Sequence, residues 1–278
     1  MRTNFVLATL AAVAASAVLA GSAGAIIGGT PDNTHTYVGL ADNGVFSCTA
    51  TLISSRIMVT AAHCFSDSAS TLGTDGQGHP RVEVTFDQQG PFTQPAPTHF
   101  TGTYYFNPSY CSPCGKGLPS FDTNDEAIIV LDQPQNRGLA TLPPIGFDDG
   151  LRTGTVLDVS GYGVSHFGKP DPCDPNCKKQ PDAFFTRLGA TSKLLGVGKG
   201  KQSELVKISG NTSQGKGGQC FGDSGGPLFL GGTNTLIGET TFGTNDNCAG
   251  VGYDTRLDTA SAQNFIYGTA TSLGLTIP

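Results

Sequence analysis

The chain has 278 residues, 39 of them glycine, and a formal net charge of −6 at pH 7. The negative charge argues against a nucleic acid partner, because binding to phosphates needs clustered Lys and Arg side chains. Charged residues make up 14% of the chain, well below the roughly 25% of an ordinary globular domain. Low charge with abundant glycine predicts an all-β protein of short strands joined by tight turns.

The first 25 residues have the features of a secretory signal peptide. Arg2 gives a positive start, an apolar stretch runs from Phe5 to Ala20, and Ala23-Gly24-Ala25 is a small-residue cleavage pattern. We expect residues 1–25 to be removed on export, which leaves a secreted, extracellular protein beginning at Ile26. Cleavage after Ala20 is the alternative. No later stretch reaches the roughly 18 apolar residues of a membrane span, so no membrane association is expected.

A histidine follows the first apolar stretch of the exported chain. Leu52 to Val59 predicts one buried strand, and Thr60-Ala61-Ala62-His63-Cys64 comes directly after it. An imidazole is suited to act as a general base near neutral pH, since its ordinary pKa is about 6.5. His63 is therefore the candidate general base, and any activity that depends on it is expected to rise as the pH passes that value.

A carboxylate begins the next strongly apolar strand. Asp125 precedes Glu126, and Ala127 to Leu131 predicts the strand itself. Asp125 is the candidate acid that orients His63. Asp122 is the alternative, disfavoured because it does not directly precede the strand. We expect the Glu126 side chain to point outward to solvent; the alternative is that it lies close enough to Asp125 to disfavour two adjacent negative charges.

A glycine-rich loop supplies the candidate nucleophile. Gly222-Asp223-Ser224-Gly225-Gly226-Pro227 puts a hydroxyl where the backbone is free to approach a substrate closely. A serine hydroxyl is a weak nucleophile alone and needs a neighbouring base such as His63. The N–H groups of Gly222 and Ser224 are expected to form an oxyanion hole.

Short apolar runs separated by Gly, Pro, Asn and Asp continue along the chain, which is typical of an all-β fold. The residues from Asp258 through Leu273 predict one amphipathic helix, with Asp258 as its N-terminal cap, Gly274 as its stop, and Phe265 and Ile266 on its packing face. The predicted strands include Arg81 to Phe86, Val156 to Ser160, Leu205 to Ile208, Leu228 to Leu230 and Leu236 to Gly238.

With these motifs in the order His, Asp, Ser, the sequence resembles the chymotrypsin/trypsin family of serine proteases. Ile26-Ile27-Gly28-Gly29 is similar to that family's processed N-terminus, Gly161-Tyr162-Gly163 to its mid-chain turn, and Thr241-Phe242-Gly243 to its substrate-binding strand. The resemblance implies one peptidase domain, residues 26–278, built from two packed six-stranded Greek-key β-barrels with a C-terminal α-helix. The first barrel is expected to span about 26–141 and the second about 142–278.

The resemblance also implies roles for individual residues. His63, Asp125 and Ser224 would form the catalytic triad of a serine endopeptidase that works through an acyl-enzyme. The freed Ile26 ammonium would pair with Asp223 and order the oxyanion loop. Thr241 stands where the family has a serine whose hydroxyl bonds to the triad aspartate. Since some proteins of this fold only bind ligands, a non-catalytic secreted binding protein is the alternative function.

The residue before the cleaved bond is expected to enter a pocket whose base, by resemblance, is Gly218. An uncharged base disfavours basic residues, so we expect a chymotrypsin-like preference for large apolar side chains. Asp254, with Asp246 behind it, keeps a trypsin-like preference for Lys or Arg as the alternative. The remaining lining residues are expected to be Thr241, Phe242, Gly243 and Gly252.

Eight cysteines in an exported chain suggest four disulfides. By resemblance, two pairs are Cys48–Cys64 and Cys220–Cys248. Local pairs are expected for Cys111 with Cys114 and for Cys173 with Cys177, and a four-thiolate zinc site is the alternative. No cofactor or metal is expected. The expected partners are protein or peptide substrates and protein inhibitors, and the protein is expected to be a monomer.

Overall fold

The computed structural model describes residues 26–90, 96–114, 123–164, 166–167, 181–182, 185–213, 216–245 and 248–278. Strands dominate, and Ala260–Ser272 forms α1, the only α-helix among these residues. Short 3₁₀ turns lie at Ala62–Cys64, Phe147–Gly150 and Gly200–Gln202. No helix within the described ranges is both long and apolar enough to cross a bilayer.

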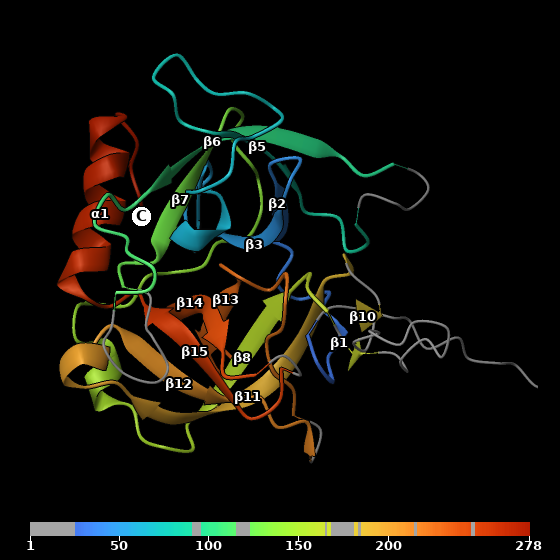
Figure 1. The fold of residues 1–278 in the computed structure, drawn as a ribbon, viewed down its shortest axis with the longest axis vertical. Helices are drawn as coiled ribbons and strands as arrows, with labels where there is room; N and C mark the ends of the chain where they lie inside the picture. Colours follow the sequence, from blue (N-terminus) through green and yellow to red (C-terminus); the bar gives the residue numbers. More distant parts are fainter. Residues whose placement is uncertain are drawn as a thin grey trace, which may run out of the picture.

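The first half of the chain forms a closed antiparallel barrel, drawn in blue to green in Figure 1. Its strands pair in the order β2-β3-β4-β7-β6-β5. β7 therefore pairs with β4, although β5 and β6 lie between them in the sequence. The strand bounds are Val38–Asp42 (β2), Ser47–Leu52 (β3), Ile57–Ala61 (β4), Arg81–Thr85 (β5), His99–Phe106 (β6) and Glu126–Leu131 (β7).

The second half forms another closed ring of six strands, in the order β11-β12-β15-β14-β13-β8, which the β8–β11 pairing closes. Two short strands, β9 (His166–Phe167) and β10 (Pro181–Asp182), pair with each other. The expected all-β fold of two six-stranded barrels with a C-terminal helix is confirmed. The bounds are Val156–Gly161 (β8), Leu188–Val197 (β11), Leu205–Ser209 (β12), Pro227–Leu230 (β13), Leu236–Gly243 (β14) and Val251–Arg256 (β15).

Each end of the described chain packs on the barrel built by the other half. β1 (Thr30–Pro31) pairs with β11 of the second barrel. Helix α1 lies beside β6 and β7 of the first barrel (Figure 1). Ile266 of α1 is fully buried and belongs to the same hydrophobic cluster as the core residues of the first barrel. These crossed ends hold the two barrels together, and the site lies between the barrels.

Two sequence-based element predictions were wrong in detail. The stretch from Leu52 to Val59 is not one strand: β3 ends at Leu52 and β4 begins at Ile57, because Ser54-Ser55-Arg56 forms a turn closed by Ile53 N–H donating to Ile57 O at 2.9 Å. The helix begins at Ala260 and not at Asp258. Thr259 is its N-cap, and the Thr259 hydroxyl accepts a hydrogen bond from Ala262 N–H at 3.1 Å.

Candidate active site

His63 lies in the 3₁₀ turn that directly follows β4. The buried Tyr104 hydroxyl on β6 contacts the carbonyl oxygens of Ala61 and Ala62, at 2.9 and 2.7 Å. A disulfide joins Cys64 to Cys48 on β3. These contacts fix the backbone on both sides of His63, so the imidazole is held by the barrel wall and not by a free loop.

Asp125 lies next to His63 because β4 and β7 are paired, with Ala61 opposite Glu126. The Asp125 carboxylate is fully buried. Its Oδ1 accepts a hydrogen bond from the His63 backbone N–H at 2.8 Å, and its Oδ2 accepts one from the His63 ring Nδ1–H at 2.8 Å. This pair of bonds orients the ring, with Nδ1 on the side of the carboxylate and Nε2 on the opposite side.

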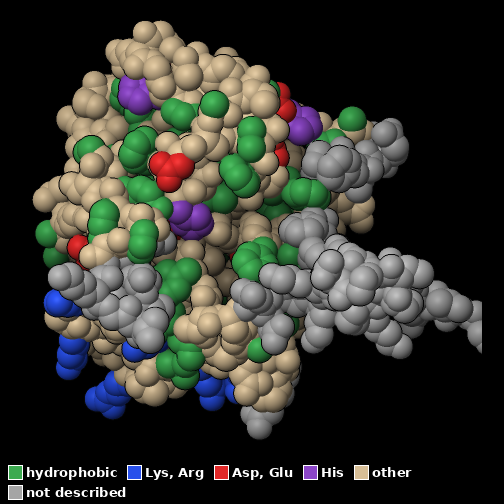
Figure 2. Space-filling model, in the orientation of Figure 1, with side chains coloured by type: hydrophobic (Ala, Val, Ile, Leu, Met, Phe, Trp, Pro, Cys, Tyr) green, Lys and Arg blue, Asp and Glu red, His purple; other side chains and the backbone are tan. Residues whose placement is uncertain are grey.

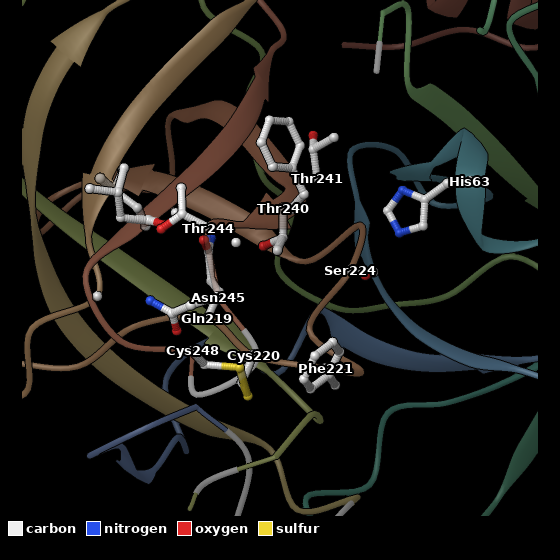
Figure 3. A pocket seen from close by; sticks show the side chains of 16 residues that line it. His63, Gln219, Cys220, Phe221, Ser224, Thr240, Thr241, Thr244, Asn245 and Cys248 are labelled. Atoms are coloured by element: carbon white, nitrogen blue, oxygen red, sulfur yellow. A yellow bond between two sulfur atoms is a disulfide. The ribbon is translucent and has the colours of Figure 1, made fainter. Parts of the chain in front are cut away.

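Ser224 belongs to a loop of the second barrel that is docked on the first. Thr49 on β3 donates from its backbone N–H to Ser224 O at 2.9 Å and from its hydroxyl to Gly222 O at 3.1 Å. Gly222 and Gly225 have φ values of +91° and +72°, a conformation that glycine adopts without the strain of a side chain. His63 and Ser224 line the same pocket (Figure 3).

The amides of Gly222 and Ser224 donate no hydrogen bond to any residue in the described ranges. The neighbouring amides do: Asp223 N–H donates to Cys220 O at 3.0 Å and Gly225 N–H to Thr240 O at 2.8 Å. Two backbone donors on either side of Asp223 are therefore available beside the serine, which is the arrangement that an oxyanion hole needs.

Asp223 is fully buried beneath the loop. Its carboxylate accepts hydrogen bonds from the N–H groups of Gly163 and Cys220, both at 2.8 Å, and from the backbone N–H of the fully buried Ile26. Burial raises the pKa of Asp223 to about 7, and these three donors act in the opposite direction. Ile26 and Asp223, for which the resemblance implies a pair, are thus brought together.

A pocket of about 450 Å³ opens between the nucleophile loop and strands β14 and β15 (Figure 3). Thr241, Phe242, Gly243 and Gly252 line it. Gly218 is not among the lining residues, and a Cβ there would lie 2.6 Å from the Cα of Gly210, which does line the pocket. Figure 2 shows this face of the molecule hollowed between the barrels, with Lys and Arg side chains gathered at the lower edge, away from the hollow.

Two side chains next to the triad differ from expectation. Glu126 is buried and not turned to solvent, because β7 is covered on both faces; its Oε1 accepts a hydrogen bond from Asn107 Nδ2 at 2.5 Å. The Thr241 hydroxyl bonds to the Thr255 hydroxyl at 2.7 Å and not to Asp125. A register shift between Thr240 and Phe242, where β14 pairs with β15, accompanies this orientation.

Sequence reasoning also missed Glu239, a fully buried carboxyl on β14 whose electrostatic neighbours include Asp125 and Asp254. Burial raises its pKa well above the ordinary value, and the negative charges of Asp125 and Asp254 add to this effect. An acidic residue in the otherwise uncharged run Leu236 to Gly243 was the only signal for it. Thr49 gave no sequence signal at all, because its contacts to the nucleophile loop are long-range.

Within the described ranges, three disulfides join Cys48 to Cys64, Cys111 to Cys114 and Cys220 to Cys248. Among the described residues no cluster of His, Cys, Asp or Glu has the geometry of a metal site. Other residues named from the sequence lie outside the described ranges, namely residues 1–25, Asp122, Cys173, Cys177 and Asp246.

The family model for Trypsin matches residues 26–266. Snake venom serine protease KN8 of Trimeresurus stejnegeri is 27% identical over 217 residues, which cover 74% of this chain and 73% of that protein. Trypsin beta of Drosophila erecta is 26% identical over 225 residues, or 79% of each chain. Among solved structures, HL collagenase aligns with a TM-score of 0.63 at 18% identity, covering 90% of this chain and 100% of the other; this likeness concerns the fold alone.

The family match includes both barrels, both halves of the site and most of helix α1. The chain therefore belongs to the trypsin family of serine proteases.

Proposed function

We propose that the protein is a secreted serine endopeptidase that hydrolyses peptide bonds through His63, Asp125 and Ser224. The observation that carries this proposal is the 2.8 Å hydrogen bond from His63 Nδ1–H to Asp125 beside a pocket that both His63 and Ser224 line. Protein and peptide chains are the substrates of this family. We also propose that protein inhibitors bind to this protein and that it is a monomer.

The chemistry follows from the protonation state of the imidazole. With Nδ1–H donating to Asp125, Nε2 is left to take the Ser224 hydroxyl proton as the oxygen attacks the scissile carbonyl. The amides of Gly222 and Ser224 bind the oxygen that becomes negative. Protonated His63 then gives its proton to the leaving amine. In the second half of the reaction His63 takes a proton from water, the water oxygen attacks the acyl group, and His63 returns the proton to the Ser224 oxygen as the acyl group leaves.

Activation depends on the charge of Ile26. Asp223 is buried and bonds only to neutral backbone donors, so a free Ile26 ammonium would stabilise its carboxylate. We propose that signal peptidase releases this amine directly by cutting after Ala25. N-terminal sequencing of the active, exported protein tests this step: a chain that begins at Gly21 and is already active contradicts it.

Export is supported by the composition of residues 1–25, and three of the relatives carry the name snake venom serine protease. Expression of the full chain in a secreting host tests it. The expected result is that the protein is recovered from the medium without residues 1–25; retention of the intact chain in the cell contradicts export.

Ser224→Ala tests the proposed chemistry. We expect the variant to lose roughly four orders of magnitude or more in turnover of a peptide substrate while keeping its thermal unfolding temperature. A fluorophosphonate should label the processed wild-type protein at Ser224 and leave the variant unlabelled. Unlabelled wild-type protein that is folded and begins at Ile26 would favour a binding function over catalysis.

A further inference from the structure

The two amides beside the serine belong to peptide groups whose direction is fixed. A peptide group is planar and trans, so its N–H points away from its own carbonyl oxygen, and a bond to the carbonyl also fixes the N–H. The carbonyl that shares a peptide group with the Gly222 amide accepts a hydrogen bond from Val164 N–H at 2.8 Å. The carbonyl that shares one with the Ser224 amide accepts a hydrogen bond from Gly226 N–H at 2.7 Å. Backbone donors from the second half of the chain thus hold both groups.

The peptide group between these two, which joins Gly222 to Asp223, is held from the other barrel. Its N–H donates to Cys220 O at 3.0 Å, and its carbonyl, Gly222 O, accepts a hydrogen bond from the Thr49 hydroxyl on β3 at 3.1 Å. Of the three carbonyls, this is the one that a side chain holds. Rotation of the middle group would change the angle between the outer two, and with it the point at which their N–H groups converge.

Gly222 offers little resistance of its own to such a rotation. Its φ is +91°, and a residue without a Cβ passes between backbone conformations more freely than any other. The side chain of the preceding Phe221 is 54% exposed, so packing restrains the loop only partly on that side. The orientation of Gly222 O therefore depends on the donor that it meets.

The Thr49 hydroxyl is suited to be that donor because its own direction is fixed. Thr49 is fully buried, and its Oγ1 accepts a hydrogen bond from Tyr162 N–H at 3.1 Å, which leaves the one hydroxyl proton for Gly222 O. The Thr49 backbone is held as well: its N–H donates to Ser224 O at 2.9 Å, and its carbonyl accepts a hydrogen bond from the Thr60 hydroxyl at 2.8 Å.

We propose that Thr49 is a positioning residue for the reaction: its hydroxyl holds Gly222 O and thereby keeps the amides of Gly222 and Ser224 directed at one point. The inference rests on the proposed peptidase function. A negative oxygen develops at that point in the transition state and not in the bound substrate, so loss of the hydroxyl lowers kcat and leaves KM nearly unchanged. A residue that only stabilised the fold would change neither value in protein that remains folded.

Thr49→Val tests this role, because valine has nearly the same shape and lacks the hydroxyl. For the peptide that the wild-type protein cleaves fastest, kcat is expected to fall about tenfold or more, with KM within about threefold. Thr51→Val is the matched control. Thr51 lies two residues farther along β3, is buried too, and its hydroxyl has no hydrogen-bond partner in the described part of the chain; this variant should keep the wild-type kcat and KM.

A peptide aldehyde and the matching peptide alcohol separate the oxyanion from the rest of binding. Ser224 Oγ adds to the aldehyde carbon and the hydroxyl proton moves to the aldehyde oxygen, so the hemiacetal oxygen lies where the negative oxygen would form. The alcohol forms no such bond. Thr49→Val is expected to weaken inhibition by the aldehyde about tenfold and inhibition by the alcohol less than about threefold. Equal weakening of both overturns the inference.

Thr49→Ser and Thr49→Ala provide the comparison if Thr49→Val does not fold. Both variants lack the methyl group, so they differ from each other only by the hydroxyl. We expect Thr49→Ser to keep kcat within about threefold of wild type and Thr49→Ala to fall about tenfold or more below Thr49→Ser. Equal kcat in the two folded variants overturns the inference.

Titration of Ser224 with a fluorophosphonate distinguishes this inference from the proposed function. Folded wild-type protein that begins at Ile26 and is neither labelled nor active on any peptide contradicts the peptidase function, and the role of Thr49 with it. If wild type is labelled and active, the role of Thr49 alone is wrong when Thr49→Val keeps the wild-type kcat or changes only in KM. The same holds when Thr51→Val loses as much kcat as Thr49→Val.

Discussion

Glu126 is a buried carboxyl on the strand that begins directly after Asp125. Burial raises its pKa from 4.5 to about 7, the hydrogen bond from Asn107 lowers it, and the charges of Glu204 and Asp125 raise it. The side chain is therefore neutral in mildly acidic solution and adds a second negative charge beside Asp125 only as the pH passes neutrality. Its position next to Asp125 suggested this arrangement only as the alternative, because an acidic side chain is usually exposed.

Glu126→Gln should change how stability depends on pH. The folded protein holds this proton up to a higher pH than the unfolded chain does, so wild-type stability falls as the pH rises from about 4.5 to about 7. The loss amounts to about 3 kcal/mol at most. Urea unfolding at pH 4.5 and pH 8 should find the variant close to wild type at the lower pH and more stable than wild type at the higher one.

Asp67→Asn provides the control, because the Asp67 side chain is exposed and has no hydrogen bond or ion pair to another residue in the described ranges. This change should shift the urea midpoint by a similar small amount at both pH values. If the free energy of unfolding of Glu126→Gln falls with pH as steeply as that of wild type, Glu126 is not the group that titrates.

The nucleophile loop depends on close contact between two elements that are far apart in the chain. Gly225 has a φ of +72°, and a Cβ there would lie 2.1 Å from the Thr60 hydroxyl and 2.6 Å from Ala61 N on β4. The loop therefore lies directly against the strand that leads to His63. Glycine is required at this position for both conformation and space.

Gly225→Ala is expected to separate Ser224 from His63. Because backbone atoms occupy the space, the loop must move, and we expect a loss of about 3 kcal/mol or more in the free energy of unfolding together with loss of fluorophosphonate labelling. Gly76→Ala is the control, since a Cβ at Gly76 has open space around it. Labelling of Gly225→Ala at the wild-type rate would contradict the contact.

The two barrels are joined by a buried arginine. Arg187 is 2% exposed, and its Nη1 donates to Phe86 O of the first barrel at 2.8 Å, to Val38 O at 3.1 Å and to the Tyr162 hydroxyl of the second at 2.9 Å. Its Nε donates to Asp32 O at 3.1 Å. The guanidinium of Arg187, the residue directly before β11, thus links the second barrel to three carbonyl groups from the first half of the chain.

Replacing Arg187 with Met keeps the apolar stem and removes all of these donors. The carbonyl oxygens stay buried without their charged partner, so we expect a loss of about 3 kcal/mol or more in the free energy of unfolding. Arg137→Met is the control: its guanidinium stacks on Phe86 at 4.5 Å from the ring centroid, and its loss should cost about 1 kcal/mol or less. Equal unfolding midpoints in urea for the two variants would contradict the role of Arg187.

The sequence alone determined much of this protein. The alternation of short apolar runs with turn residues was enough for the all-β class, and the resemblance of the motifs to a known family implied the two barrels. The contexts of His63, Asp125 and Ser224 were enough to single out these three residues as candidates. Local patterns carry such information because strand period and turn chemistry depend on neighbouring residues. The split at Ser54-Ser55-Arg56 was missed, since the apolar residues on both sides read as one run.

Only the tertiary structure decided how deep individual side chains lie and what they face. Glu126 is buried because β7 is covered on both faces, Thr241 turns to Thr255 because β14 and β15 shift register, and Asp254 lies behind Gln219 because β15 pairs with β12 and β14. Each outcome depends on strands distant in the chain. A strand's own sequence fixes the alternation of its two faces, but pairing with other strands decides what covers each face.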